Sequence, residues 1–345
     1  MTSPSPVRRG RLRVLNPIVL VGAMFVGLLA VGLAFALGLG PVPDAGDAEA
    51  GNRLGMEWPK TGQAAVEIEG MGGPVAGGER KRVPIASVTK VMTAYLVLRG
   101  HPLRAGEDGP SIVIDRTASV ESGNRDESTV FLGEGQRFSQ RRMLQLMLLP
   151  SANNVARLLA RWDAGSEGAF VRKMNAAAAR LGMRDTVYTG ASGYEASTVS
   201  TAVDQLALAR AAMREPALAA VVGAREATVP GVGVVRNTNR LLDEPDVVGL
   251  KTGSSTPAGG ALMWAARVPS GDGSRLVLGV VLRQGGSGTS LDQKLEAAFD
   301  GSRRLLATAR RLLARPGTTP PSAPSAGRIA ANAAPTGGRS AAFGF

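Results

Sequence analysis

The sequence has no cysteine and a single histidine in 345 residues. Without cysteine there are no disulfides, no thiol catalysis and no cysteine metal sites, although a domain of this size can be exported without them. The histidine, His101, precedes Pro102 in a turn, which indicates a loop residue rather than the base of a Ser-His-Asp triad. With no second histidine and no helical His-Glu pair, we expect neither a metal nor another cofactor.

Lysine is scarce as well, since 34 of the 40 basic residues are arginines and only six are lysines. Arginine cannot lose its proton in a protein, whereas lysine can. A lysine that persists against this bias therefore marks a position where a titratable amine can be required. The six are Lys60, Lys81, Lys90, Lys173, Lys251 and Lys294.

The formal charge of +12 lies mainly at the two ends of the chain. Four arginines fall in residues 1–13 and seven follow residue 302, with no acid in either stretch, which leaves about +1 for the part between them. A nearly neutral domain does not offer the basic face that a nucleic acid needs. We therefore predict no nucleic-acid partner, and basic tails beside a membrane explain the charge better.

Residues 18–40 carry no charge and follow four arginines. A run of this length can cross a bilayer as a helix, and the preceding positive charges favour a cytoplasmic N-terminus. We predict a cytoplasmic segment at 1–17, a single membrane anchor at 18–40, a linker at 41–60 and an extracytoplasmic domain. A cleaved signal peptide, which would give a secreted protein, is the alternative.

Hydrophobic periodicity predicts an α/β (α+β) domain over residues 61–315. An alternating strand at 64–69 precedes a Gly-rich turn at 70–78, and three short strands at 247–250, 261–266 and 276–282 come late. This order predicts an antiparallel sheet flanked by helices, with a helical subdomain inserted between its parts. The helices are expected at 88–99, 140–149, 153–162, 169–181, 202–214 and 291–315. Residues 316–345 are rich in Pro, Ala, Gly, Ser and Thr, which predicts a disordered tail.

The last predicted helix has one apolar stripe flanked by arginines. Such a stripe can lie on a membrane surface or pack on the sheet of its own domain, and the second interpretation is favoured. The stripe consists of Leu305, Leu306, Ala309, Leu312 and Leu313.

Ser87 and Lys90 stand three residues apart at the start of a helical pattern, so both face the same side. At the first turn, free backbone N–H groups and the positive helix end would point at a developing oxyanion. Burial and a neighbouring cation would lower the pKa of Lys90 enough for it to take the serine proton. The alternative is that Ser87 only caps the helix, and on its own a Ser-x-x-Lys pair does not exclude this.

Two further clusters follow in the same order along the chain. Ser151-Ala152-Asn153 lies between two predicted helices, and Lys251-Thr252-Gly253 lies on a predicted strand. Because lysine is so scarce here, a chance Lys-Thr-Gly triplet is rare. The three clusters together resemble the motif set of penicillin-binding proteins and serine β-lactamases.

Within that superfamily the chain most closely resembles the D-alanyl-D-alanine carboxypeptidases, peptidase family S11, over about residues 60–300. This resemblance implies a β-lactamase/transpeptidase-like fold and a serine hydrolase that removes the terminal D-alanine from peptidoglycan stem peptides and is acylated by β-lactam antibiotics. It is carried by residues 84–94, 149–154, 200–207, 237–242 and 249–253.

The resemblance also implies a role for each motif residue. Ser87 would be the acylated nucleophile and Lys90 its general base. Ser151 would relay a proton to the leaving amine, and Asn153 would hold Lys90 or the substrate amide. On the strand, Lys251 and the Thr252 hydroxyl would bind the substrate carboxylate, Gly253 would let the substrate backbone approach, and Ser254 would add a backbone N–H to the oxyanion hole.

Three alternatives remain. The triplet Ser122-Gly123-Asn124 also fits the second motif, but the charged residues around it, including Glu121 and Glu127, favour a solvated turn. A β-lactamase would need a deacylating glutamate, and no Glu-x-x-Leu-Asn pattern lies between Ser151 and Lys251. A non-catalytic scaffold that binds the cell wall is disfavoured because every motif residue is intact.

Overall fold

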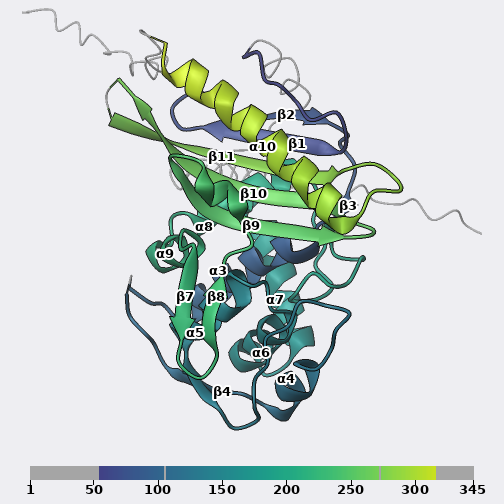
Figure 1. Cartoon of the computed structure of the whole chain (residues 1–345), viewed down its shortest axis with the longest axis vertical. Helices are drawn as coiled ribbons and strands as arrows, with labels where there is room; N and C mark the ends of the chain where they lie inside the picture. Colours follow the sequence, from purple (N-terminus) through teal and green to yellow (C-terminus); the bar gives the residue numbers. More distant parts are fainter. Residues whose placement is uncertain (1–53, 105, 272, 316–345) are drawn as a thin grey trace, which may run out of the picture.

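A five-stranded antiparallel sheet with the order β2-β1-β11-β10-β9 forms one half of the domain (Figure 1). The structure is a computed structural model that describes residues 54–104, 106–271 and 273–315. The predicted segments at 1–17, 18–40 and 316–345 lie outside these residues. The strands are β1 (Gln63–Ile68), β2 (Val75–Gly78), β9 (Val247–Ser255), β10 (Gly259–Ser270) and β11 (Gly273–Gln284).

Both faces of the sheet are buried, and alternate residues along each strand belong to different cores. Ala65 and Met263 pair with Val280 from opposite sides, and this row faces the helical half of the domain. One position along, Trp264 faces the other core and lies against Gly279, where an added Cβ would come within 2.1 Å of the indole ring. The predicted strands and their antiparallel pairing are thus confirmed.

Helix α10 (Leu291–Leu313) covers the outer face of the sheet (Figure 1). The helix begins with a capping box, in which the Ser290 side chain and the Gln293 side chain satisfy each other's backbone N–H groups. Leu305, Leu306 and Ala309 are fully buried against the sheet. The interpretation that the apolar stripe packs on the domain's own sheet is therefore confirmed.

The helical half packs against the opposite face of the sheet, which α8 covers directly through contacts with β1, β10 and β11. Helix α3 is central to this half and contacts α5, α6, α7, α8 and α9. The helices are α3 (Lys90–Gly100), α4 (Arg116–Glu121), α5 (Gln140–Leu148), α6 (Asn153–Ala164), α7 (Glu167–Arg180), α8 (Ala202–Ala212) and α9 (Pro216–Val222), with the 3-10 turns η1 (Ala86–Thr89) and η2 (Arg240–Asp243).

The helical insertion predicted between the strands is confirmed, but it also contains three short antiparallel pairs that periodicity did not reveal. Each strand is only two to four residues long, which is too short for an alternating pattern. The pairs are β3 (Val83–Pro84) with β6 (Val199–Ser200), β4 (Ser111–Val113) with β5 (Arg137–Ser139), and β7 (Glu226–Val229) with β8 (Gly233–Arg236).

Two predicted boundaries are wrong. The Gly-rich stretch at 70–78 is not all turn, because it contains the edge strand β2. The ring of Trp58 lies close against this strand, so that a Cβ added at Gly77 would come within 2.3 Å of the ring. The linker does not reach residue 60, because Met56 is 7% exposed and belongs to the core under α10. Both errors arise because packing across the sheet leaves no local signal in a Gly-rich sequence.

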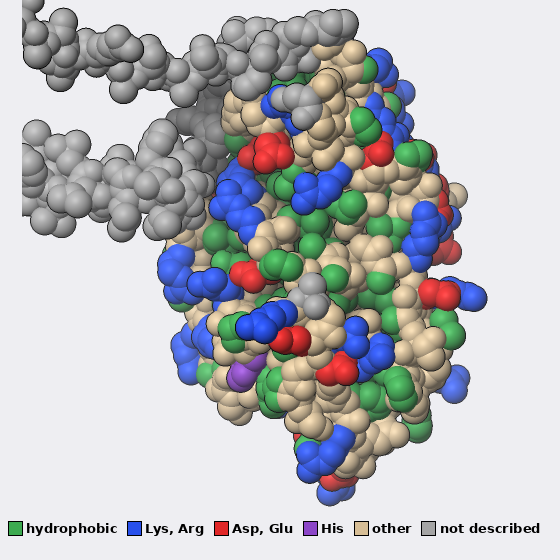
Figure 2. Space-filling view, turned by 90° about the vertical axis from the view of Figure 1, so that its left-hand side faces the viewer, with side chains coloured by type: hydrophobic (Ala, Val, Ile, Leu, Met, Phe, Trp, Pro, Cys, Tyr) green, Lys and Arg blue, Asp and Glu red, His purple; other side chains and the backbone are tan. Residues whose placement is uncertain are grey.

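On the face drawn in Figure 2, basic and acidic side chains are interspersed rather than gathered into a field of one sign. Among the ion pairs of the domain are those of Arg303 with Glu244 and of Arg310 with Glu244. Among the described residues there is no helix with the length and apolar character needed to span a bilayer.

Candidate active site

Ser87 lies in η1, the short turn that leads into α3, and it does not cap a helix. The N-cap positions of η1 and α3 are Ile85 and Thr89, and neither makes a side-chain capping bond. Ala86, the residue before the serine, has a φ of 45°. A left-handed non-glycine residue is strained, and such strain is concentrated at functional sites. The capping alternative for Ser87 is therefore wrong, and its hydroxyl is free for other contacts.

Lys90 is fully buried at the start of α3, and its amine has three oxygen neighbours. Nζ lies 2.8 Å from Ser87 Oγ, 2.5 Å from Asn153 Oδ1 and 2.8 Å from the Ser192 carbonyl oxygen. The last two are carbonyl oxygens, which only accept hydrogen bonds. Ser87 is thus the only one of the three that can donate a proton to the amine.

The second motif lies in the turn between α5 and α6. Ser151 is 6% exposed and has a φ of 68°, so this turn is also strained. Asn153 is the first residue of α6 and is 5% exposed. The fold thus brings Asn153 onto Lys90 across 63 positions of sequence.

The third motif lies on β9, the sheet edge that packs against η1. Lys251 is buried, and its Nζ donates to the Thr252 carbonyl oxygen at 3.1 Å. The Thr252 hydroxyl lies 2.6 Å from that of Thr238, a residue that the sequence did not single out for this site. A Cβ at Gly253 would lie 3.0 Å from the Ser87 nitrogen, so the glycine keeps the space around this N–H open. Ser254 follows on the same strand, paired with Gly260.

Burial is the largest cause of the pKa shift of both site lysines. Burial lowers the pKa of Lys90 well below its ordinary value, the cations Lys251 and Arg157 lower it further, and the carboxylates Glu127 and Glu195 oppose this shift. Burial also lowers the pKa of Lys251 to about 7. The shift of the Lys90 pKa favours the neutral form of the amine that faces Ser87.

His101 does not reach this site. It follows the last residue of α3, about 16 Å along the helix from Lys90 by the rise of 1.5 Å per residue. Its ring stacks on Trp162, with 4.0 Å between the ring centroids. Within the described part of the chain, no group of His, Asp and Glu side chains is arranged to hold a metal ion.

The interpretation of residues 121–127 as a solvated turn is partly wrong. Ser122 is buried, and its Oγ donates to the Ala118 carbonyl oxygen at 3.0 Å. The Glu127 side chain is only 4% exposed and accepts a 2.6 Å hydrogen bond from Asn153 Nδ2. The triplet that mimics the second motif is structural, whereas its charged neighbour Glu127 reaches the site.

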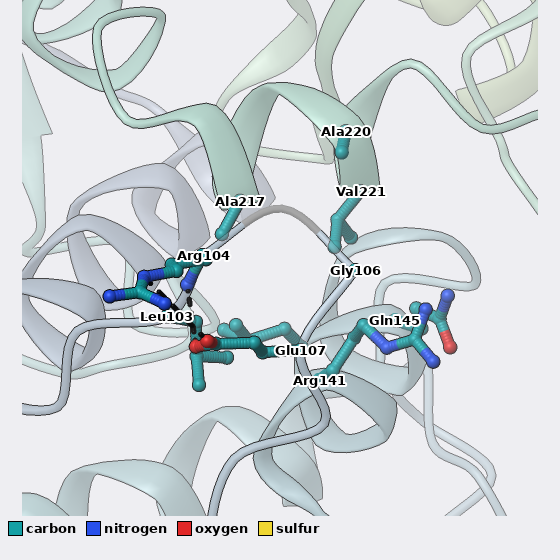
Figure 3. Close-up of a pocket in the computed structure, with 10 residues that line it drawn as sticks. Leu103, Arg104, Gly106, Glu107, Arg141, Gln145, Ala217, Ala220 and Val221 are labelled. Atoms are coloured by element: carbon teal, nitrogen blue, oxygen red, sulfur yellow. Dashed lines mark hydrogen bonds and ion pairs between the residues drawn. The ribbon is translucent and has the colours of Figure 1, made fainter.

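A cavity of about 170 Å³ lies elsewhere in the helical half, between α9 and the segment around Glu107 (Figure 3). Arg104 and Glu107 both line it, and the Arg104 backbone nitrogen donates to Glu107 Oε2 at 2.9 Å. The residues that line this cavity include none of the predicted site residues. The predicted site residues lie instead around the junction of η1, α6 and β9.

The fold and this junction place the chain in a class: proteins of the penicillin-binding protein type, here with a buried lysine amine that faces a serine hydroxyl. The profile of the D-alanyl-D-alanine carboxypeptidase family, peptidase family S11, matches residues 61–284. This chain belongs to that family.

The names of individual relatives agree with this family assignment. A D-alanyl-D-alanine endopeptidase of Pseudomonas aeruginosa is 36% identical over 191 residues, which are 52% of this chain and 58% of the relative. The D-alanyl-D-alanine carboxypeptidase DacD of Escherichia coli is 31% identical over 212 residues, 60% of this chain and 54% of DacD. The chain thus spans little more than half the length of these curated relatives. The crystal structure of penicillin binding protein 6B from Escherichia coli superposes with a TM-score of 0.63 at 28% identity, covering 72% of this chain and 77% of that one.

Proposed function

We propose that this chain is a serine-type D-alanyl-D-alanine carboxypeptidase that removes the terminal D-alanine from peptidoglycan stem pentapeptides and is acylated by penicillins. The observation that carries the proposal is the buried Lys90 amine, 2.8 Å from Ser87 Oγ. The family match and the name of the structural neighbour, a penicillin binding protein, support the same activity.

In the proposed acylation step, the two N–H groups of a neutral Lys90 donate to Asn153 Oδ1 and the Ser192 carbonyl oxygen. The lone pair then points at the Ser87 hydroxyl and takes its proton as Oγ attacks the carbonyl carbon of the penultimate D-alanine. The proton passes through the Ser151 hydroxyl to the leaving D-alanine amine. Water then hydrolyses the ester on Ser87 and regenerates the hydroxyl.

The β9 edge would bind the substrate. Lys251, with the Thr252 hydroxyl, pairs with the terminal carboxylate, and the backbone N–H groups of Ser87 and Ser254 hold the oxyanion. The open space at Gly253 supports this arrangement, because a side chain there would crowd the Ser87 nitrogen. Lys251 and Thr252 thus select a substrate that ends in a free carboxylate.

The decisive assay uses a fluorescent penicillin and a peptide that ends in D-Ala-D-Ala. A carboxypeptidase retains the label on the protein and releases D-alanine from the peptide. Rapid loss of label with hydrolysed penicillin would instead identify a β-lactamase, and absence of label would identify a wall-binding scaffold. The relative from Pseudomonas aeruginosa is named an endopeptidase, so a cross-linked stem-peptide dimer should be assayed in parallel to detect that activity.

The pKa of Lys251 predicts how substrate binding depends on pH. Because that pKa is about 7 in the free protein, the cation is present below pH 7 and is lost above it. The kcat/KM for the D-Ala-D-Ala peptide should therefore fall above pH 7, by up to about tenfold per pH unit. Replacing Lys251 by methionine should lower kcat/KM and flatten this decline. A decline of the same shape in Lys251→Met would contradict the assignment.

We also propose that residues 18–40 anchor the chain in the cell membrane, with the catalytic domain on the outer face. The uncharged run and the four arginines before it support this topology. When the full chain is expressed in a bacterial host, the protein should fractionate with the membrane and keep its N-terminus. A soluble product that begins after Ala36 or Ala48, as found by N-terminal sequencing, would show signal-peptide cleavage instead.

A further inference from the structure

The side-chain amide of Asn153 is held in one orientation. Its Oδ1 accepts from Lys90 Nζ at 2.5 Å, and its Nδ2 donates to Glu127 Oε2 at 2.6 Å. An amide has an accepting end and a donating end, whereas a carboxylate can only accept. Glu127 therefore determines which end of Asn153 meets Lys90. With the amide reversed, an NH₂ group would face the amine and compete for the lone pair that should face Ser87.

Glu127 is itself held by charged and polar partners. Arg157 on α6 donates to both of its carboxylate oxygens, from Nη1 at 3.1 Å and Nη2 at 2.6 Å, and Asn124 Nδ2 donates at 3.0 Å. The Glu127 and Arg157 side chains are 4% and 11% exposed. Next to Glu127 in sequence, the Ser128 carbonyl oxygen accepts from the Asn153 nitrogen at 2.8 Å. The carboxylate is thus fixed both through its own bonds and through the backbone.

Glu127 also balances a positive charge near the base. Burial raises the pKa of the Glu127 carboxyl, but hydrogen bonds from Arg157 and Asn153 outweigh burial, so the pKa lies below its ordinary value and the group is ionised at neutral pH. The charged groups with the largest effects on the pKa of Lys90 are Lys251 on β9, Arg157 on α6, Glu127 before α5 and Glu195 before β6. Of these, Glu127 and Arg157 form a pair with opposite effects on the amine. If Glu127 alone were removed, Arg157 would still lower the pKa of Lys90 and Glu127 would no longer raise it.

We propose that Glu127 is a positioning residue that acts through Asn153, fixing the amide oxygen on Lys90 and offsetting the charge of Arg157 beside the catalytic base. The proposal rests on the proposed function, since it assigns Lys90 as the base. It adds a residue outside the three motifs to the machinery of the site.

The test compares Glu127→Gln with Glu121→Gln. Glu121 is a matched control because it also pairs with Arg157, at 3.1 Å from Nε, whereas the Asn153 amide bonds to Lys90 and Glu127. Glu127→Gln should lower the acylation rate by the fluorescent penicillin about 10- to 100-fold, as expected for a lost charge-assisted hydrogen bond. The acylation rate rises with pH as Lys90 loses its proton. In Glu127→Gln the midpoint of this rise should lie at lower pH than in the wild type, because loss of the carboxylate lowers the pKa of Lys90. Glu121→Gln should leave both the acylation rate and the midpoint of its rise with pH unchanged.

A second variant guards against a folding defect caused by the loss of one of the two carboxylates that pair with Arg157. The double variant Glu127→Gln/Arg157→Gln removes both charges. The midpoint at which its acylation rate rises with pH should therefore return toward that of the wild type. Its acylation should stay slow, because a glutamine can present either end of its amide to Asn153. Wild-type acylation in this double variant, or equal effects of the two single variants, would overturn the proposal.

One readout does not depend on catalysis. The chain has only six lysines, so the Lys90 signal of protein labelled with ¹³C-lysine can be assigned by comparison with Lys90→Arg and titrated by NMR. The Lys90 midpoint should move to lower pH in Glu127→Gln and stay in place in Glu121→Gln. An unmoved midpoint in Glu127→Gln refutes the proposal about Glu127. A wild-type protein that neither binds penicillin nor cleaves the peptide refutes the proposed function instead.

Discussion

Ser87→Ala is expected to abolish covalent labelling by penicillin and to lower peptide hydrolysis by at least about 10⁴-fold, since no other group can form the acyl-enzyme. The physical reason is that Ser87 alone among the neighbours of the Lys90 amine can give up a proton and become a nucleophile. Labelling is measured by gel fluorescence and by the mass of the intact protein.

The matched control for this variant is Ser119→Ala, which removes another half-buried serine, on α4. It should label like the wild type. The melting temperatures of both variants should stay close to that of the wild type, because neither change removes buried apolar area. Undiminished labelling of a folded Ser87→Ala protein would rule out the nucleophile assigned here.

Lys90→Arg is expected to lower acylation by about 10²- to 10⁴-fold, the usual contribution of a general base. Arginine keeps the positive charge but cannot release its proton, so it cannot take one from Ser87. Lys90→Gln should be equally impaired, since it also lacks a base but avoids a buried guanidinium. The rates are measured by stopped-flow mixing with a fluorescent penicillin.

Lys251→Arg is the comparison for this variant, because it makes the same change at the other buried lysine of the site. Its proposed task is to attract a carboxylate, which a guanidinium can do, so measurable acylation should remain. Thermal melting establishes that each variant is folded. Equal losses of acylation in folded Lys90→Arg and Lys251→Arg would remove the division of roles between the two lysines.

Much of the fold could be predicted because the long elements carry their own periodicity. The strand at Gln63–Ile68, the helices of the middle part and the late strands all lie within a few residues of their predicted positions. The elements that were missed are short or rich in glycine. Strand β2 is one example, because its Val75 and Ala76 are buried by the sheet rather than marked by alternation.

The groups of the site also fall into those that a local sequence pattern revealed and those that it did not. Ser87 and Lys90 are neighbours on one turn, so a local pattern was enough to pair them. Glu127 lies 26 positions from Asn153 and 30 from Arg157, and among charged residues in sequence it looked solvated. The Ser192 carbonyl is a backbone group, which no residue type can reveal.

The sequence by itself determined the order of the elements, the three motifs, the scarcity of lysine and the resemblance that names the family. These properties depend on residue type and spacing along the chain, which periodicity and motif order capture. Only the tertiary structure decided that the Lys90 amine is buried among three oxygens, that Gly253 lies against the Ser87 nitrogen, and that Glu127 orients Asn153. Such contacts join distant segments, and burial and electrostatic balance exist only once packing has excluded water from between them.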